Sequence, residues 1–393
     1  MVPADPPAPD HASDSAHRRQ DLRIIGLIGM GHFLSHFYML SLPPLFLVWR
    51  QEFSVSYATL GLAVALMSGT TAVLQTPVGF LVDRHGARPF LVGGTLLMAL
   101  SVAAMAFAPT FWVILPLAIL SGIGNSVIHP ADYAILAGSI SKSFMGRAFA
   151  LHTFTGNVGF ALGPVVMGVL LEVAGVSWRT ALLIVGLLGV PVVVAILLQS
   201  RVLRDQAKPA KGAVASEELS GRALLLSRPM LLFFGFFLLS AMAGAGIQSW
   251  LVPVLGKLWG MPILAASAAL TGYTVGATAG TLVGGWMADA MKRGLLGAVV
   301  ALTLAAMALL LLPGLVRLPE VLVVAVVFLG GLALGTSRTP RDVMLRDASP
   351  PGQIGKVFGF VSSGLPLGSA ITPVPLGFLI DMGYPWLVLP VVA

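Results

Sequence analysis

The stretch Gly79-Phe80-Leu81-Val82-Asp83-Arg84-His85-Gly86-Ala87-Arg88 joins two long apolar runs, residues 57–80 and 89–108. Charged side chains are costly in the hydrocarbon core of a membrane, so a charged turn between two apolar runs is expected at a membrane face. Each run is long enough to cross a bilayer as a helix. The stretch therefore predicts two membrane-spanning helices joined by a tight turn at Gly86.

The same pattern returns 206 residues later as Gly285-x3-Asp289-x2-Lys292-Arg293. Residues 146–172 and 355–381 share eight identities in 27 aligned positions, where composition alone gives roughly two or three. This internal repeat predicts two six-helix halves in parallel repeat. The expected divisions are a disordered cytoplasmic tail at 1–23, an N-terminal half at 24–199, a cytoplasmic linker at 200–228 and a C-terminal half at 229–393.

Composition restricts the class of protein. With 57% hydrophobic and 10% charged residues, and a mean hydropathy of +0.92, the chain is expected to be an integral membrane protein. The apolar runs suit an all-α protein, since the short alternating segments of a membrane barrel are missing. The basic residues lie in short loops, so their excess favours membrane topology over nucleic-acid binding. Without a cysteine, the chain can form neither a disulfide nor a cysteine-ligated metal site.

Twelve helices are expected from the apolar runs. They cover about 24–48, 57–80, 89–108, 111–138, 145–171, 178–199, 229–255, 262–290, 294–313, 319–340, 354–380 and 384–393. Nine or ten residues rise only about 15 Å, half of a roughly 30 Å hydrocarbon core. We therefore expect the twelfth helix to be truncated at Ala393.

The distribution of lysine and arginine predicts the orientation. Nineteen of the 23 basic residues fall in the tail and in the alternate loops on its side, and the opposite side carries Arg50, Arg179, Lys257 and Arg317. By the positive-inside rule the N-terminus is cytoplasmic. A multi-pass protein of a bacterial-type inner membrane is expected.

The charged turn resembles the loop between helices 2 and 3 of the major facilitator superfamily. The resemblance implies a transporter fold and a conformational latch, in which Asp83 caps the start of helix 11 near Gly355 to Phe358. It also implies that Arg84 pairs with Asp132 and that Gly79 permits close helix approach. The expected latch residues are Gly79, Asp83, Arg84, Gly86, Arg88, Asp132, Asp289 and Asp342.

The fifth helix carries Gly159, Gly163, Pro164 and Gly168, which resemble the Gly-x3-Gly-Pro-x2-Gly-Gly motif of superfamily antiporters. Met167 replaces the first glycine of the closing pair. Ala118 stands where the antiporter pattern of the fourth helix has Arg. Plain helix packing is the alternative, because small residues at every fourth position let helices approach closely.

Helices 4 and 5 also resemble the fosmidomycin-resistance type of exporter. The residues that carry this resemblance are Asn125-Ser126-Val127-Ile128-His129-Pro130, Gly146-Arg147, Gly156-Asn157 and Gly163-Pro164. The resemblance implies an inner-membrane exporter of small, often anionic compounds.

Four histidines lie in expected membrane helices: His32, His36, His129 and His152. His32 and His36 are four residues apart and share one helix face. Intramembrane ionisable groups favour a functional role, and imidazole titrates between pH 5 and 8, so His36 is expected to carry proton coupling with His32 and His129 assisting. The alternative is a neutral imidazole that bonds to a neighbouring helix. No metal site is predicted, since no carboxylate or cysteine is expected at that depth.

Other polar side chains near mid-depth suit either solute binding or helix contacts, and they are Gln75, Asn125, Asn157, Gln248 and Tyr273. Arg338 lies at the cytoplasmic end of the tenth helix, where it could attract anions or mark the boundary. No acidic residue lies near the middle of an expected helix, because Asp132, Glu172 and Asp381 fall towards helix ends. An unpaired cation at the midplane is costly, so a neutral or anionic solute is predicted.

The sequence therefore predicts a secondary active transporter that moves a small organic solute by alternating access, with proton-coupled efflux. It contains no Gly-x4-Gly-Lys-Ser/Thr loop for ATP. Three alternatives remain: an uptake symporter or uniporter, an intramembrane histidine-based metal protein, and a transporter-like sensor. We expect no enzyme activity, no cofactor, no nucleic-acid partner and a monomer in the lipid bilayer.

Overall fold

The structure, a computed structural model, describes residues 11–140, 144–204, 226–291, 293–349, 357 and 360–393. Every secondary-structure element in these residues is helical, and eleven helices are long and apolar enough to cross a membrane. The prediction of an all-α membrane protein is confirmed.

The first half contains α1 (His11–Ser41), η1 (Pro43–Leu45), α2 (Phe46–Phe53), α3 (Tyr57–His85), α4 (Ala87–Met105), α5 (Phe111–Ser126), α6 (Ile128–Ser139), α7 (Met145–Gly168), η2 (Val169–Val173), α8 (Trp178–Leu187), α9 (Gly189–Gln199) and η3 (Ser200–Val202). The second half contains α11 (Arg228–Trp259), α12 (Ile263–Ala290), α13 (Leu295–Leu315), α14 (Glu320–Asp347), α16 (Gly364–Ile371), α17 (Pro373–Asp381) and α18 (Pro385–Val392).

One of the expected boundaries is wrong. Helix α1 already begins at His11, so the predicted disorder fails for residues 11–23, which contain neither proline nor glycine and can extend the helix. Residues 1–10 and most of the linker lie outside the described residues. The helix expected over 111–138 forms one membrane span, Phe111–Leu136, which is interrupted at Val127 where α5 ends and α6 begins. Pro130 has no N–H for the carbonyl of Ser126, which weakens the helix at this point.

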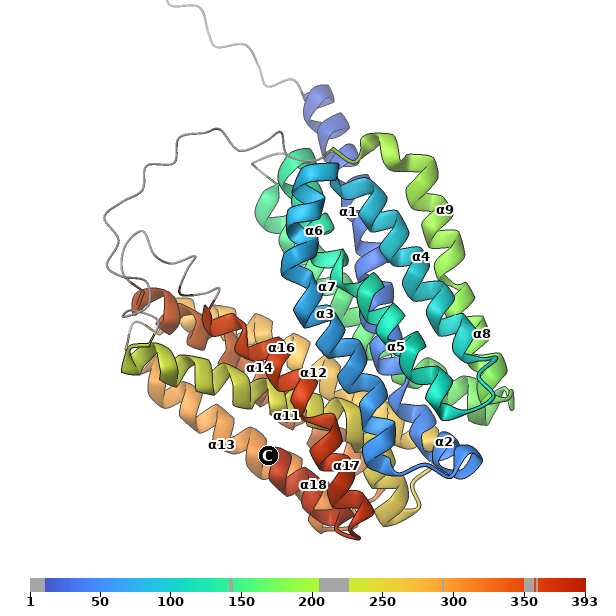
Figure 1. The fold of residues 1–393 in the computed structure, drawn as a ribbon. Helices are drawn as coiled ribbons and strands as arrows, with labels where there is room; N and C mark the ends of the chain where they lie inside the picture. Colours follow the sequence, from blue (N-terminus) through green and yellow to red (C-terminus); the bar gives the residue numbers. More distant parts are fainter. Residues whose placement is uncertain (1–10, 141–143, 205–225, 292, 350–356, 358–359) are drawn as a thin grey trace, which may run out of the picture.

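The two halves form a V (Figure 1). They meet at the end of the bundle that carries residues 54–56, 174–177, 260–262 and 382–384, which we name the closed end. They diverge towards the opposite end, which we name the basic end because it carries Arg84, Arg88, Arg201, Arg204 and Arg293.

Small residues bring the halves together. A Cβ placed on Gly61 of α3 would lie 2.7 Å from the carbonyl oxygen of Pro373 in α17. One placed on Gly377 would lie 2.6 Å from the backbone nitrogen of Ala58. On the other side of the interface, the Thr271 hydroxyl of α12 donates to the carbonyl oxygen of Ala161 in α7 at 2.7 Å.

Two carboxylates join the halves at the closed end. Asp381, which ends α17, accepts from the N–H groups of Tyr57 and Ala58 at the start of α3, both at 2.8 Å. Glu172, in η2, accepts from the N–H groups of Ile263 and Leu264 at the start of α12, at 2.6 and 2.9 Å. Free N–H groups and the positive dipole end make a helix start a favourable place for a carboxylate. Each half therefore supplies one carboxylate that accepts hydrogen bonds from the start of a helix in the other half.

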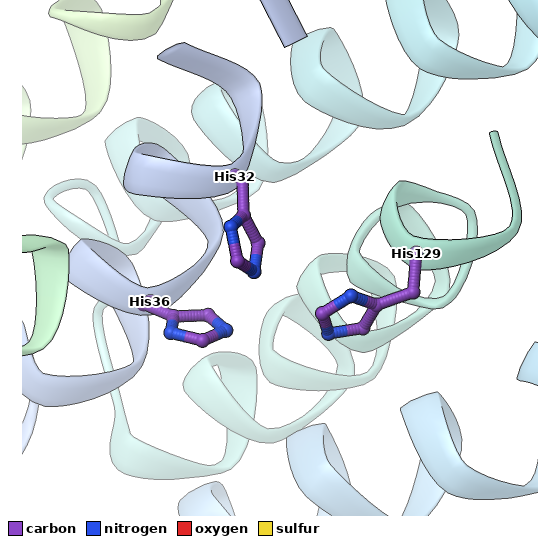
Figure 2. A group of neighbouring side chains, drawn as sticks. All are labelled: His32, His36 and His129. Carbon is purple, nitrogen blue, oxygen red and sulfur yellow. The ribbon is translucent and has the colours of Figure 1, made fainter. Parts of the chain in front are cut away.

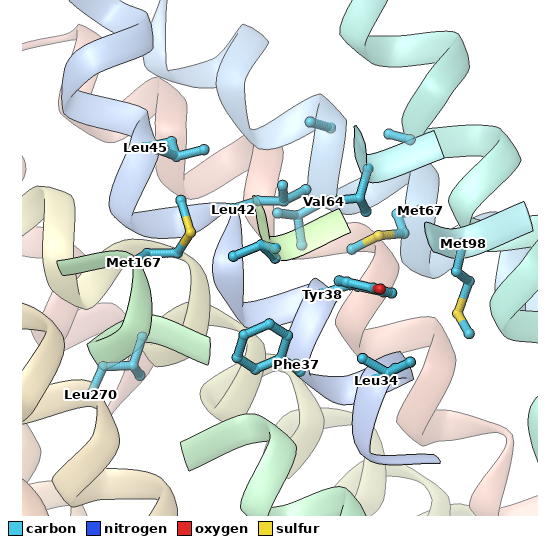
Figure 3. Close-up of a cluster of buried hydrophobic side chains, with 14 of the residues drawn as sticks. Leu34, Phe37, Tyr38, Leu42, Leu45, Val64, Met67, Met98, Met167 and Leu270 are labelled. Atoms are coloured by element: carbon cyan, nitrogen blue, oxygen red, sulfur yellow. The ribbon is translucent and has the colours of Figure 1, made fainter. Parts of the chain in front are cut away.

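A large apolar cluster fills the first half and continues into the interface between the halves, where Met167 and Leu270 belong to the same group of buried side chains (Figure 3). Tyr38, which is 1% exposed, donates its hydroxyl to the carbonyl oxygen of Gly186 at 3.1 Å. This satisfies the one polar group of a buried aromatic ring.

Glycines bring α12 and α14 into backbone contact in the second half. A Cβ on Gly276, Gly280 or Gly284 would lie 2.1–2.3 Å from a carbonyl oxygen of α14. Gly331 and Gly335 of α14 face carbonyl oxygens of α12 in the same way. The two helices therefore pack along a stripe of small residues, as is common inside membranes.

Candidate functional site

Four imidazoles and one carboxylate gather in the first half, between α1, α6 and α7. His32 and His36 come from α1, His129 and Asp132 from α6, and His152 from α7. Figure 2 shows that His32, His36 and His129 point towards one another. The predicted histidine group is thus a real cluster, and Asp132 is an additional member.

Local sequence explains how the helices position these side chains. The break before α6 places His129 in the first turn of that helix, and Asp132 follows three residues later on the same face. Helix α7 approaches α1 closely because Gly156 and Gly159 have no side chain. A Cβ on Gly156 would lie 2.5 Å from His32 Cε1, and one on Gly159 would lie 2.2 Å from the carbonyl oxygen of Phe33.

The cluster is tightly packed. The ring centroid of His32 lies 3.9 Å from that of His152 in a stacked arrangement, 4.5 Å from that of His36 and 5.0 Å from that of His129. His32 and His152 are 3% and 1% exposed, and Asp132 is 0% exposed. Three of the five polar side chains are therefore buried, and His36 and His129 are half-buried.

Two hydrogen bonds fix part of this group. His152 Nε2 donates to Asp132 Oδ2 at 2.8 Å. His32 Nδ1 lies 2.8 Å from the carbonyl oxygen of His152. A carbonyl oxygen only accepts, so the proton is on Nδ1 of His32 and a neutral His32 presents a lone pair at Nε2.

Asp132 was expected as a latch partner of Arg84, and this pairing is wrong in the structure. Arg84 is exposed in the last turn of α3, whereas Asp132 is buried and bonded to His152. The expectation that no carboxylate lies at the depth of the histidines fails for the same reason. The spacing from His129 to Asp132, three residues on one helix, was the sequence signal that could have identified it.

The other polar candidates lie apart from the cluster. Asn125 of α5 donates to the Thr71 hydroxyl of α3 at 3.3 Å, so it bonds two helices together. Tyr273 of α12 is buried, and its hydroxyl has no partner among the described residues. The remaining four are half-buried on separate helices: Gln75 on α3, Asn157 on α7, Gln248 on α11 and Arg338 on α14. Among the described residues, no hydrogen bond joins any of these candidates to the histidines.

The expected latch is only partly described. Gly86 makes the predicted turn with φ 89°, and Arg88 donates to the carbonyl oxygen of Leu203. Gly79 does not serve close packing here, because a Cβ on it would meet no described heavy atom within 4 Å. Asp342 accepts from the neighbouring Arg341. The side chains of Asp83 and Asp289, and most of the start of helix 11, lie outside the described residues.

The fifth-helix motif packs against two different neighbours. A Cβ on Gly163 would lie 2.7 Å from the carbonyl oxygen of Phe37 in α1, next to the similar contact of Gly159. A Cβ on Gly168 would lie 2.9 Å from Cα of Leu264 in α12, and Pro164 is buried between the two glycines. The motif therefore lies where α7 meets both α1 and the other half.

Comparison with known proteins agrees with this architecture. A family model described as Major Facilitator Superfamily matches residues 28–266 and 238–392. The chain is similar to the fosmidomycin resistance protein of Escherichia coli (strain K12), with 26% identity over 382 residues that cover 95% of this chain and 90% of that protein.

Solved structures share the fold. The nucleoside transporter NupG superposes with a TM-score of 0.75 at 15% identity, covering 95% of each chain. A bacterial homolog to the human lysosomal transporter Spinster, in an inward-facing and unoccupied conformation, gives 0.76 at 14% identity, covering 92% of this chain and 83% of that one. The family and these structures are those of transporters and not of enzymes. The chain consists of two helical halves whose apolar helices cross the membrane many times. It belongs to the major facilitator superfamily of membrane transporters.

Proposed function

We propose that the protein is a secondary active exporter that moves a small neutral or anionic organic solute out of the cytoplasm by alternating access. Protons are the proposed coupling ion. The observation that carries the proposal is the arrangement of the halves, which are joined by Asp381 and Glu172 at one end and diverge towards the other.

The charge distribution supports the proposed direction. If the basic end faces the cytoplasm, as the positive-inside rule favours, then the two halves diverge towards the cytoplasm, which is the arrangement expected of a transporter that receives a cytoplasmic solute. The inward-facing conformation of the Spinster homolog and the resistance named for the Escherichia coli relative support the same assignment. The lack of an ATP-binding loop leaves an ion gradient as the energy source.

Reconstituted protein tests the proposal directly. Proteoliposomes that record internal pH should show proton movement when fosmidomycin, the probe suggested by the relative's name, is added on the side of the basic end. Empty liposomes and a quaternary ammonium compound serve as controls, because the carboxylate of the site, Asp132, is fully buried and already bonded to His152, which keeps it from pairing with a bulky permanent cation. Transport of the cation with proton movement, or solute uptake down its gradient without any proton movement, would contradict the proposal.

The two carboxylates of the closed end give a second prediction. Removing both charges in the variant Glu172→Gln/Asp381→Asn should shift the protein towards a conformation in which the closed end opens. Each contact at a helix start is worth about 0.3–1 kcal/mol at an exposed site, so the pair changes the ratio of conformations roughly threefold to thirtyfold. Transport should slow while the protein remains folded.

Distance measurements between spin labels check this shift. The chain contains no cysteine, so Thr110→Cys and Val316→Cys, both exposed at the closed end, give two unique label sites in opposite halves. The fraction of molecules with a long distance between the two spin labels should be larger in the double variant than in the parent protein. Glu320→Gln, which removes an acid from the first turn of α14 at the same end, should leave the distances unchanged. Identical distances in all three proteins would rule out the role of the two carboxylates.

A further inference from the structure

The geometry of the histidine cluster points to a function beyond the proposed export: we propose that His32, His36 and His129 bind one divalent transition-metal ion. One ring nitrogen from each of the three residues lies within 4.8 Å of those of the others. Three nitrogen donors on two helices that point to one place are the usual start of a zinc or cobalt site. Figure 2 shows the three rings around a common space.

The second observation is a set of polar atoms without partners. His32 Nε2, His36 Nδ1 and His129 Nδ1 are buried, and no described residue offers any of them a hydrogen bond. A buried polar atom without a partner costs about 1–3 kcal/mol, so three beside one another need an explanation. A metal ion accepts a lone pair from all three nitrogens at once, whereas a water molecule can satisfy all three only if at least one of them carries its proton.

The surroundings of His32 match those of a metal ligand. Its Nδ1 proton is donated to the carbonyl oxygen of His152, which leaves the lone pair at Nε2 facing the other two rings. Ligating histidines commonly donate their second ring N–H to a carbonyl or carboxylate in this way, which fixes the tautomer and the ring. The second ring nitrogen of His32 is therefore already held as a ligand requires.

Charge also favours a cation here. Asp132 is fully buried beside the cluster, with Oδ2 bonded to His152 and Oδ1 without a described partner. Its negative charge offsets part of the charge of a divalent ion in a poorly solvated site. Three neutral imidazoles and one nearby carboxylate select zinc, cobalt, nickel or copper over magnesium and calcium, which require oxygen ligands.

Binding requires a small inward movement. Metal–nitrogen distances of about 2.0–2.1 Å in tetrahedral geometry separate ligand atoms by roughly 3.4 Å, so nitrogens as much as 4.8 Å apart must approach one another. The movement has to come from rotation of the His36 and His129 side chains, because the His32 ring already packs against Gly156 and stacks on His152. Three protein ligands leave a fourth position open to water or to an anionic group of the solute.

Cobalt(II) is the probe for the test, since a tetrahedral cobalt site absorbs visible light. The full chain, purified in detergent without a polyhistidine tag and stripped with a chelator, should bind one cobalt ion with a tetrahedral spectrum. Zinc should displace it, and magnesium should not. The variants His36→Gln and His129→Gln should each lose more affinity than the roughly 10–100-fold that follows loss of an outer partner.

The matched control is His85→Gln, which removes an exposed histidine from the end of α3 and should leave cobalt binding unchanged. Zinc should also raise the thermal midpoint of the unmodified protein, a measurement that needs no variant. Cobalt that does not bind to the stripped protein, or that binds equally well to the His36 and His129 variants, would overturn the proposal. Binding in detergent requires no transport, so its failure and the failure of export are distinguishable.

Discussion

Gly280→Leu is expected to abolish the folded protein. Gly280 lies in the middle of α12, and a Cβ there would sit 2.1 Å from the carbonyl oxygen of Leu332 and 2.7 Å from the backbone nitrogen of Thr336. Backbone atoms cannot rotate away as a side chain can, so α12 and α14 would have to separate. Overpacking costs about 1–3 kcal/mol where side chains can adjust, and more where they cannot. Size-exclusion chromatography in detergent should show aggregate in place of the monodisperse peak.

The matched control is Gly285→Leu in the same helix, where a Cβ would meet no described heavy atom within 4 Å. The chemical change is identical, and replacing a helical glycine by leucine gains about 0.8–1 kcal/mol in helix propensity. This variant should therefore elute as the parent does, with an equal or higher thermal midpoint. Equal behaviour of the two variants would show that α12 and α14 do not pack through their glycines.

His152→Leu is expected to destabilise the protein by about 3–5 kcal/mol, the usual cost of leaving a buried carboxylate without its partner. His152 gives Asp132 its described hydrogen bond, and Asp132 is fully buried. Leucine fills similar space but donates no proton, which leaves both carboxylate oxygens without a described partner. Thermal unfolding followed by tryptophan fluorescence should show the loss.

The double variant His152→Leu/Asp132→Leu separates loss of the pair from loss of packing. With the buried carboxylate also removed, much of the stability should return, because an apolar replacement of a buried pair is often neutral or better. If the double variant is as unstable as the sum of the single variants, then the pair is not coupled and the hydrogen bond contributes nothing.

Much of the fold could be predicted from the sequence, because long apolar runs and a charged turn leave few alternatives in a membrane. The turn at Gly86 and the two-half architecture are examples. The break at Val127 could not be placed with the same certainty, since proline inside a membrane helix either kinks it or is accommodated by neighbours. The start of α1 at His11 does not follow from composition, because a polar stretch without proline or glycine is compatible with either a disordered tail or an extended helix.

The candidate site was predicted in part. The shared face of His32 and His36 follows from helix periodicity alone. The arrival of His129, His152 and Asp132 at that face depends on how α6 and α7 pack, through Gly156 and Gly159, and no local pattern determines such packing. Glu172 and Asp381 are equivalent residues in the repeat alignment. Their contacts at the closed end could not be predicted, because the sequence does not say which helix starts lie opposite them.

The carboxylate contacts of Glu172 and Asp381, each made to a helix start of the opposite half, affect how the closed end can open. These equivalent residues occupy matching positions in two repeats related by an axis along the membrane normal, so one contact is made twice, as in a two-fold symmetric dimer. The two carboxylate contacts therefore lie on opposite sides of that axis, one at the start of α3 and one at the start of α12. If one contact breaks, the other still joins the two halves on the opposite side of the axis. The halves therefore separate at the closed end only when both contacts break together. Loss of one contact tilts the halves but does not separate them.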